Sequence, residues 1–149
     1  MATSTSFDFG RLDPRSVRAR ESYRPCTWRR RMLSRVSEGM VAHKLKGVRQ
    51  KTKDPLDVIC GRVGIEVKTL IDPRPGTRQI SVHKDCRLRK LRLAEEQKLV
   101  LMTVVLDYRN GDPPKVYFRW GVHSYCIRNL QPVTWIRLKE MIDERNTSK

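Results

Sequence analysis

The chain has 149 residues, with 32 Lys and Arg against 16 Asp and Glu, so its formal net charge is +16. This length fits one small domain and excludes a large multidomain enzyme, and the 38% hydrophobic content excludes a wholly disordered basic tail. A positive charge of this size draws a protein toward polyanions such as nucleic acid or an anionic membrane.

Residues 1–26 are predicted to form a basic flexible arm. Arg recurs at positions 11, 15, 18, 20 and 24 among Ser and Pro, and no apolar period accompanies it. Two interpretations stay open at this point: a solvated tail, or a strap along a phosphate backbone. The remaining residues, 27–149, are predicted to form a single domain.

The cysteines and the apolar runs indicate the compartment. The four cysteines, at positions 26, 60, 86 and 126, form no CxxC pair, which argues against a structural zinc site and favours free thiols in a reduced compartment. The longest apolar stretch, residues 99–106, is far shorter than the roughly 20 residues that cross a bilayer. The N-terminus lacks the apolar block of a secretory signal. We therefore expect a cytoplasmic protein without membrane contact.

The first half of the domain is predicted to be a helix followed by a hairpin. Apolar residues recur every three to five positions over 27–47, which is the helical spacing. This spacing predicts either one helix or a helix broken in two. Two short β-like runs, 56–60 and 64–70, flank a Gly-Arg-Val turn and predict a hairpin. Residues 72–76, which contain two prolines and a glycine, must form a loop.

The second half is predicted to be helix, two strands and helix. Residues 81–98 hold no Gly or Pro and predict a helix whose inward face carries Val82, Cys86, Leu93 and Ala94. The apolar run 99–108 predicts a strand covered on both faces at the centre of the sheet. Residues 115–123 alternate and pair back on it, and 134–145 form a last helix. The class is α/β (α+β), a small mixed central sheet flanked by helices, in the order α-β-β-α-β-β-α.

The candidate chemistry lies in the hairpin. Residues i and i+2 of a strand point to one face, so Glu66 and Lys68 project side by side, and hairpin pairing brings Asp57 beside Glu66. Mg²⁺ is held by one or two carboxylates together with water and substrate phosphate, and a neighbouring lysine can orient the attacking water. The alternative interpretation is a solvent-facing cluster of salt bridges.

Two further groups accompany this set. Glu38 lies on the stripe of the first helix that faces the sheet, where it either helps to hold the metal or pairs with an arginine. The segment after the hairpin presents basic side chains suited to a nucleic-acid backbone, with solvated surface as the alternative. These side chains are Arg78, His83, Lys84, Arg87 and Lys90.

The arrangement resembles the PD-(D/E)XK nuclease superfamily, in which a helix with an acidic residue precedes a hairpin that bears Asp and (D/E)-x-Lys. The resemblance covers about residues 36–106. It implies that Asp57 and Glu66 are metal ligands, that Lys68 is the catalytic lysine and that Glu38 is the acidic residue of the helix. It also implies a site contact from the next helix, for which the candidates are Gln79 and Lys84.

The match departs from the motif at one point. The Pro-Asp pair is not contiguous at Asp57, whereas Asp54 and Pro55 stand in the opposite order, so Asp54 is the alternative ligand. The resemblance implies a restriction-endonuclease-like fold, Mg²⁺ with Mn²⁺ as a substitute, DNA as partner, and a homodimer where both strands are cut. The predicted function is a metal-dependent DNA endonuclease of phage or mobile-element type, and the alternative is a non-catalytic nucleic-acid-binding protein.

Overall fold

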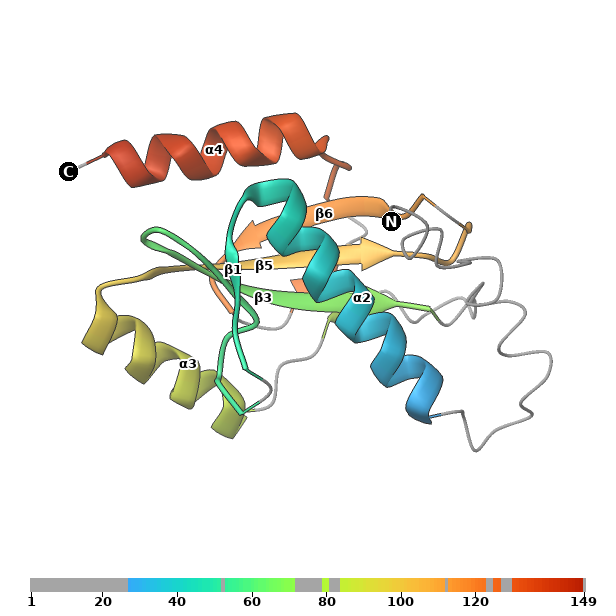
Figure 1. Cartoon of the computed structure of the whole chain (residues 1–149), viewed down its shortest axis with the longest axis horizontal. Helices are drawn as coiled ribbons and strands as arrows, with labels where there is room; N and C mark the ends of the chain where they lie inside the picture. Colours follow the sequence, from blue (N-terminus) through green and yellow to red (C-terminus); the bar gives the residue numbers. More distant parts are fainter. Residues whose placement is uncertain are drawn as a thin grey trace, which may run out of the picture.

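A computed structural model describes residues 27–51, 53–71, 79–80, 84–111, 113–122, 125–126 and 130–148. The predicted basic arm, residues 1–26, lies outside the described residues. In the described ranges the elements follow one another along the chain, and the three helices flank a sheet (Figure 1). They are α2 (Thr27–Leu45), β1 (Val48–Arg49), β2 (Val58–Cys60), β3 (Val63–Leu70), β4 (Gln79–Ile80), α3 (Lys84–Gln97), β5 (Val100–Asp107), β6 (Lys115–Trp120), β7 (Tyr125–Cys126) and α4 (Trp135–Thr147).

The predicted class is confirmed, because a five-stranded mixed sheet in the order β1-β2-β3-β5-β6 is flanked by helices. The predicted order of elements differs from the observed one by three additional strands, β1, β4 and β7, of two residues each. Two residues are too few to give an alternating pattern, so periodicity could not find them. The first helix is continuous from Thr27 to Leu45 and has no break.

The pairing of β3 with its two neighbours fixes the geometry around the hairpin. β2 and β3 are antiparallel, with Val58 opposite Ile65 and Cys60 opposite Val63. β3 and β5 are parallel along their whole length, and α3 lies on the connection between them, as parallel pairing requires a long crossover. β6 then returns antiparallel to β5, as the sequence predicted.

The two faces of the sheet pack against two different hydrophobic clusters. The larger core lies on the face covered by α2 and α4, where Val63 and Ile65 of β3 pack with Leu45 and Leu138. A smaller core with Leu101 and Ala94 lies on the face toward α3. Since side chains alternate along β3, Glu66 and Lys68 belong to the α3 face.

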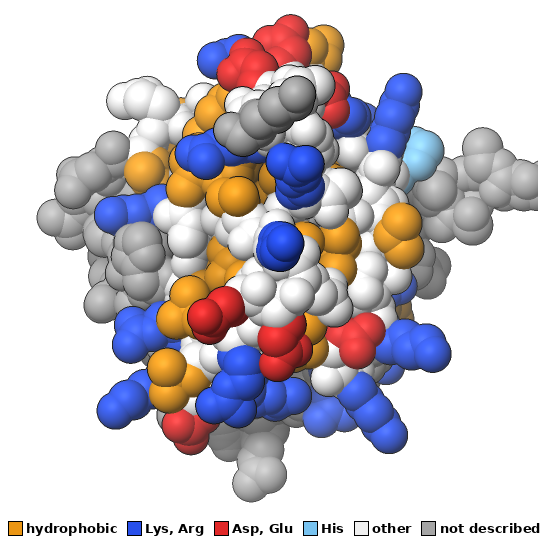
Figure 2. All heavy atoms as spheres, turned by 90° about the vertical axis from the view of Figure 1, so that its left-hand side faces the viewer, with side chains coloured by type: hydrophobic (Ala, Val, Ile, Leu, Met, Phe, Trp, Pro, Cys, Tyr) orange, Lys and Arg blue, Asp and Glu red, His pale blue; other side chains and the backbone are white. Residues whose placement is uncertain are grey.

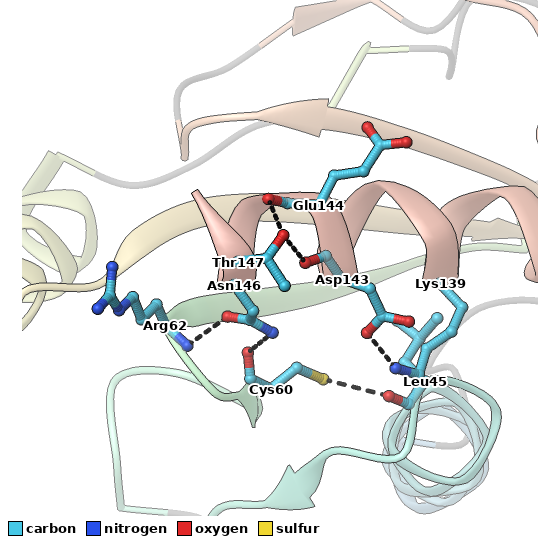
Figure 3. Close-up of polar contacts among 8 residues, drawn as sticks. All are labelled: Leu45, Cys60, Arg62, Lys139, Asp143, Glu144, Asn146 and Thr147. Atoms are coloured by element: carbon cyan, nitrogen blue, oxygen red, sulfur yellow. Dashed lines mark hydrogen bonds and ion pairs between the residues drawn. The ribbon is translucent and has the colours of Figure 1, made fainter. Parts of the chain in front are cut away.

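The C-terminal end of α4 holds the turn between β2 and β3 (Figure 3). The Asn146 side chain accepts a hydrogen bond from the backbone N–H of Arg62 at 2.8 Å and donates one to the carbonyl of Cys60 at 3.2 Å. Gly61 between them has φ +62°, and a Cβ there would lie 2.7 Å from Asn146 Oδ1. The hairpin that carries Asp57 and Glu66 is therefore fixed to a helix more than 80 residues away in the sequence.

Cys60 and Cys86 are free thiols, as the sequence predicted. Burial raises the pKa of the Cys60 thiol to about 11, and its Sγ lies 3.8 Å from the Leu45 carbonyl (Figure 3). Cys86 is exposed, so its predicted inward position is wrong; the buried side chains of α3 are Lys90 and Ala94, both beyond its first turn. Among the helices described, none is long and apolar enough to cross a membrane.

Candidate active site

Strands β2 and β3 bring Asp57 and Glu66 together. The antiparallel register ends with Val58 opposite Ile65, and the backbone N–H of Asp57 also donates to the Ile65 carbonyl at 3.0 Å, so Asp57 lies just before β2 and near Glu66. The Asp57 Oδ2 accepts a hydrogen bond from the Val67 N–H at 2.7 Å. The backbone of β3 therefore fixes the Asp57 side chain next to Glu66, as the hairpin prediction required.

Glu66 is buried, with 6% of its surface exposed, and carries two ion pairs. Lys68 Nζ lies 2.9 Å from Oε1, and Lys90 Nζ lies 3.3 Å from Oε2. The Lys68 side chain is 33% exposed, whereas that of Lys90 is only 7% exposed. One ammonium of the pair therefore borders solvent and the other is enclosed by protein.

The placement of Lys90 corrects the sequence interpretation. Lys90 was expected on a surface that faces a nucleic-acid backbone, but its side chain is buried and pairs with Glu66. The reason is its phase on α3, because it precedes Ala94 by one helical turn and shares the inward face with it. A signal was present in the sequence: Lys90 lies four residues from both Cys86 and Ala94, on the stripe predicted to face inward.

The charge of Asp57 is poorly compensated. Its pKa rises from the ordinary value of 3.8 to about 7, first because the carboxyl is partly removed from water and second because it faces the negative charge of Glu66. The Val67 hydrogen bond and the Lys68 charge lower this pKa, but they do not offset the two larger causes. Adjacent carboxylates in this state repel each other, and a cation between them relieves the repulsion.

Glu38 occupies the edge of this site. Its Oε2 accepts hydrogen bonds from Arg49 Nε at 3.2 Å and Nη2 at 3.1 Å, so of the two sequence alternatives the pairing with an arginine is observed. Its charge still reaches Asp57 and raises the pKa of that carboxyl, by less than the charge of Glu66 does. In this structure Glu38 therefore lies near the carboxylate pair, and its side chain is held by Arg49 of β1.

Asp54 does not face Glu66. It is exposed, and its Oδ2 accepts a hydrogen bond from the Lys51 N–H at 3.1 Å within a tight turn. Between the two aspartates that the sequence left open, the structure therefore places Asp57 in the site and Asp54 in the loop before it.

The other basic candidates lie near or beyond the limits of the described chain. Lys84 is exposed at the first position of α3 and Arg87 is half-buried one turn later. Arg78 and His83 lie outside the described residues, as does the side chain of Gln79. The face shown in Figure 2 carries Lys and Arg side chains with Asp and Glu among them, so the excess charge does not form a patch of one sign there.

The donor set fits a hard divalent cation with few protein ligands. In the parts of the chain that the structure describes, no three side chains among His, Cys, Asp and Glu converge on one point. Asp57 and Glu66 provide two adjacent carboxylates, and Mg²⁺ binds proteins through one or two carboxylates while it keeps water and takes phosphate oxygens. The residues present therefore fit Mg²⁺ and do not fit a closed tetrahedral zinc site.

The register adds a residue that the sequence did not single out. Thr103 of β5 lies directly across from Glu66 and is fully buried. Its hydroxyl donates to the Gly121 carbonyl at 2.7 Å, so it links β5 to the end of β6 and supports the strand beside the site. No sequence pattern marked it, because a single Thr in an apolar strand is common.

No family model matches this chain, and no curated protein is similar to it at a significant level.

Proposed function

We propose that this protein is a metal-dependent DNA endonuclease that hydrolyses phosphodiester bonds. The observation that carries the proposal is the pair of Asp57 and Glu66, which the backbone of β3 holds near each other, with Lys68 on the same face of β3 as Glu66. The pKa of Asp57, raised to about 7 by burial and by Glu66, is what a site built for a cation produces without its cation.

The order of elements supports the proposal. α2 carries Glu38, β2 and β3 form the antiparallel hairpin with the acidic residues, and α3 leads to β5, which is parallel to β3. This is the succession that the resemblance to the PD-(D/E)XK superfamily implies. The arrangement of elements favours phosphodiester hydrolysis by analogy, and the side chains at the site support it independently.

Asp57 and Glu66 would hold Mg²⁺ in this function. The ion supplies positive charge that offsets the charge of the reacting phosphate, and it makes water more acidic. Lys68 can leave Oε1 of Glu66, because its side chain borders solvent, and can then donate to a phosphate oxygen or orient the attacking water. Val67 holds the Asp57 side chain in place through its backbone N–H.

The charge of the protein favours a polyanionic substrate. The net charge of +16 attracts a polyanion, and α3, which borders the site through Lys90, presents exposed Lys84, Arg89 and Arg92 on its outer surface. Such contacts are made to phosphates and therefore position the duplex without reading its sequence.

The second candidate is a nucleic-acid-binding protein without catalysis. The observation that favours it is that both oxygens of Glu66 are already paired with ammonium groups, which is also the geometry of a structural ion-pair cluster. In this case the positive charge of the protein binds the nucleic acid, and the carboxylates stabilise the fold.

Cleavage assays separate the two functions. The purified chain is incubated with supercoiled, linear and branched DNA in Mg²⁺, Mn²⁺ or EDTA, together with the variants K68A, D57N and E66Q. D54N is the matched control, because Asp54 is an exposed carboxylate three residues from Asp57. We expect cleavage that needs the divalent ion, falls about 100-fold or more in K68A and persists in D54N.

Two results contradict the proposal. Salt-sensitive DNA binding without cleavage under any of these conditions supports the binding protein. Cleavage that survives both K68A and D57N shows that the reaction occurs elsewhere or comes from a contaminant.

A further inference from the structure

The carboxylate of Glu66 is shared by two lysines of different character. Lys68 approaches Oε1 from the same strand and borders solvent, while Lys90 approaches Oε2 from α3 and is enclosed. An exposed lysine can exchange partners when a ligand arrives. A lysine with 7% of its side chain exposed would leave a buried charge unpaired if it moved away, so it keeps its partner.

Stability alone gives little reason for a lysine at this position. Lys90 lies on the face of α3 that packs toward the sheet, one turn from Ala94 of the apolar cluster with Leu101. Buried ion pairs are often no more stable than well-packed apolar side chains of similar volume. A long apolar residue such as Met would fill this space and could reach the same cluster.

Lys90 provides a second positive charge next to Glu66. Asp57 and Glu66 provide two negative groups, and Lys68 and Lys90 provide two positive ones. If Lys68 turns toward a substrate phosphate, Lys90 is the positive group that stays on Glu66. A fixed positive charge next to a ligand oxygen also opposes the binding of any second cation at that oxygen.

We propose that Lys90 is a positioning residue, a fixed counter-ion that keeps Oε2 of Glu66 occupied, frees Lys68 for the substrate and lowers the affinity of the site for divalent cations. This inference rests on the proposed nuclease function. It specifies that the site binds its ion weakly because a lysine of the next helix competes with it.

The test measures Mn²⁺ binding to the full chain without nucleic acid, by the electron paramagnetic resonance signal of free Mn²⁺. The variants K90M and K90Q remove the charge and keep much of the side-chain volume. Both are expected to bind Mn²⁺ about tenfold more tightly than the wild type, since a unit positive charge at contact distance is removed. K98M is the control, because Lys98 is exposed directly after the end of α3 and its charge is screened, and we expect a change below about twofold.

Cleavage provides a second measurement. The Mn²⁺ concentration that gives half the maximal rate is expected to fall about tenfold in K90M and to stay unchanged in K98M. A purely structural ion pair predicts another pattern, namely a loss of thermal stability with no gain in Mn²⁺ affinity.

The outcomes separate this inference from the function on which it rests. In the first outcome the wild type binds Mn²⁺ and cleaves DNA, and both variants are folded. If the Mn²⁺ affinity of both variants is then unchanged or weaker than that of the wild type, only the role of Lys90 is overturned. If the wild type and both variants take up no Mn²⁺ and the wild type cleaves nothing, the proposed function and this inference fail together. Circular dichroism confirms that each variant is folded, and K90Q replaces K90M if the apolar variant is not.

Discussion

The substitution D57N is expected to make the protein more stable while it abolishes its activity. Asparagine has nearly the shape of aspartate, and its Oδ1 can accept the Val67 hydrogen bond that Asp57 accepts at 2.7 Å. What the substitution removes is a half-buried charge that faces Glu66, and these two causes, partial burial and Glu66, raise the pKa of Asp57 to about 7.

The magnitude follows from linkage between protonation and folding. The unfolded chain releases the Asp57 proton near pH 3.8 and the folded chain near pH 7, so the ionised carboxylate costs about 4 kcal/mol in the folded state above pH 7. The free energy of unfolding of the wild type therefore falls between about pH 4 and pH 7, because the folded state binds the proton more tightly. A neutral amide accepts a weaker hydrogen bond than a carboxylate, which reduces the net gain of D57N at pH 8 to about 2–4 kcal/mol.

Urea unfolding in EDTA at pH 8 and at pH 5 measures this difference. At pH 5 the folded wild type is protonated at Asp57 and the gap should shrink to about 1 kcal/mol. Mn²⁺ at pH 8 should stabilise the wild type and leave D57N unchanged, since a ligand stabilises only the state that binds it. The control D54N should stay within about 0.5 kcal/mol of the wild type at both pH values.

The result that refutes this reasoning is a D57N protein that is less stable than the wild type at pH 8, or a gap that is the same at both pH values. Either result means that Asp57 carries a charge that is solvated or well paired. The electrostatic argument for a cation site would then fail.

Three further predictions concern the frame of the site and its substrate. N146A should lower the free energy of unfolding, measured by urea denaturation, by about 1–3 kcal/mol, since two hydrogen bonds to the β2–β3 turn are lost. A loss below about 0.5 kcal/mol would mean that Asn146 does not stabilise this turn. G61A should be more destabilising in the wild type than in N146A, where the cost falls to about 1–2 kcal/mol for the positive φ alone; equal costs in a double-mutant cycle argue against the contact with Asn146. R87Q should weaken DNA binding similarly for all sequences and reduce the slope of log K against log salt by about 1; an unchanged slope in fluorescence anisotropy excludes a phosphate contact there.

Local patterns predicted the long elements because each has its own period. The hairpin, the apolar strand β5, its antiparallel return and the last helix occupy the expected positions within a few residues. The two-residue strands β1, β4 and β7 were missed, since they exist through their pairing partners and carry no pattern of their own. Which face of a helix packs against the sheet also depends on the elements around it, and for this reason Cys86 was predicted to face inward although it is exposed.

The sequence by itself determined that Glu66 and Lys68 would share one face of a strand and that a short turn would bring Asp57 near them, because alternation along a strand and a short turn leave little freedom. Only the tertiary structure decided which of the nearby charges joined them. It paired Glu38 with Arg49 and left Asp54 in a turn. It also placed Lys90 against Glu66 from α3, the helix that connects the parallel strands β3 and β5. These contacts depend on how α2 and α3 dock on the sheet, and docking is set by the whole core and not by any local period.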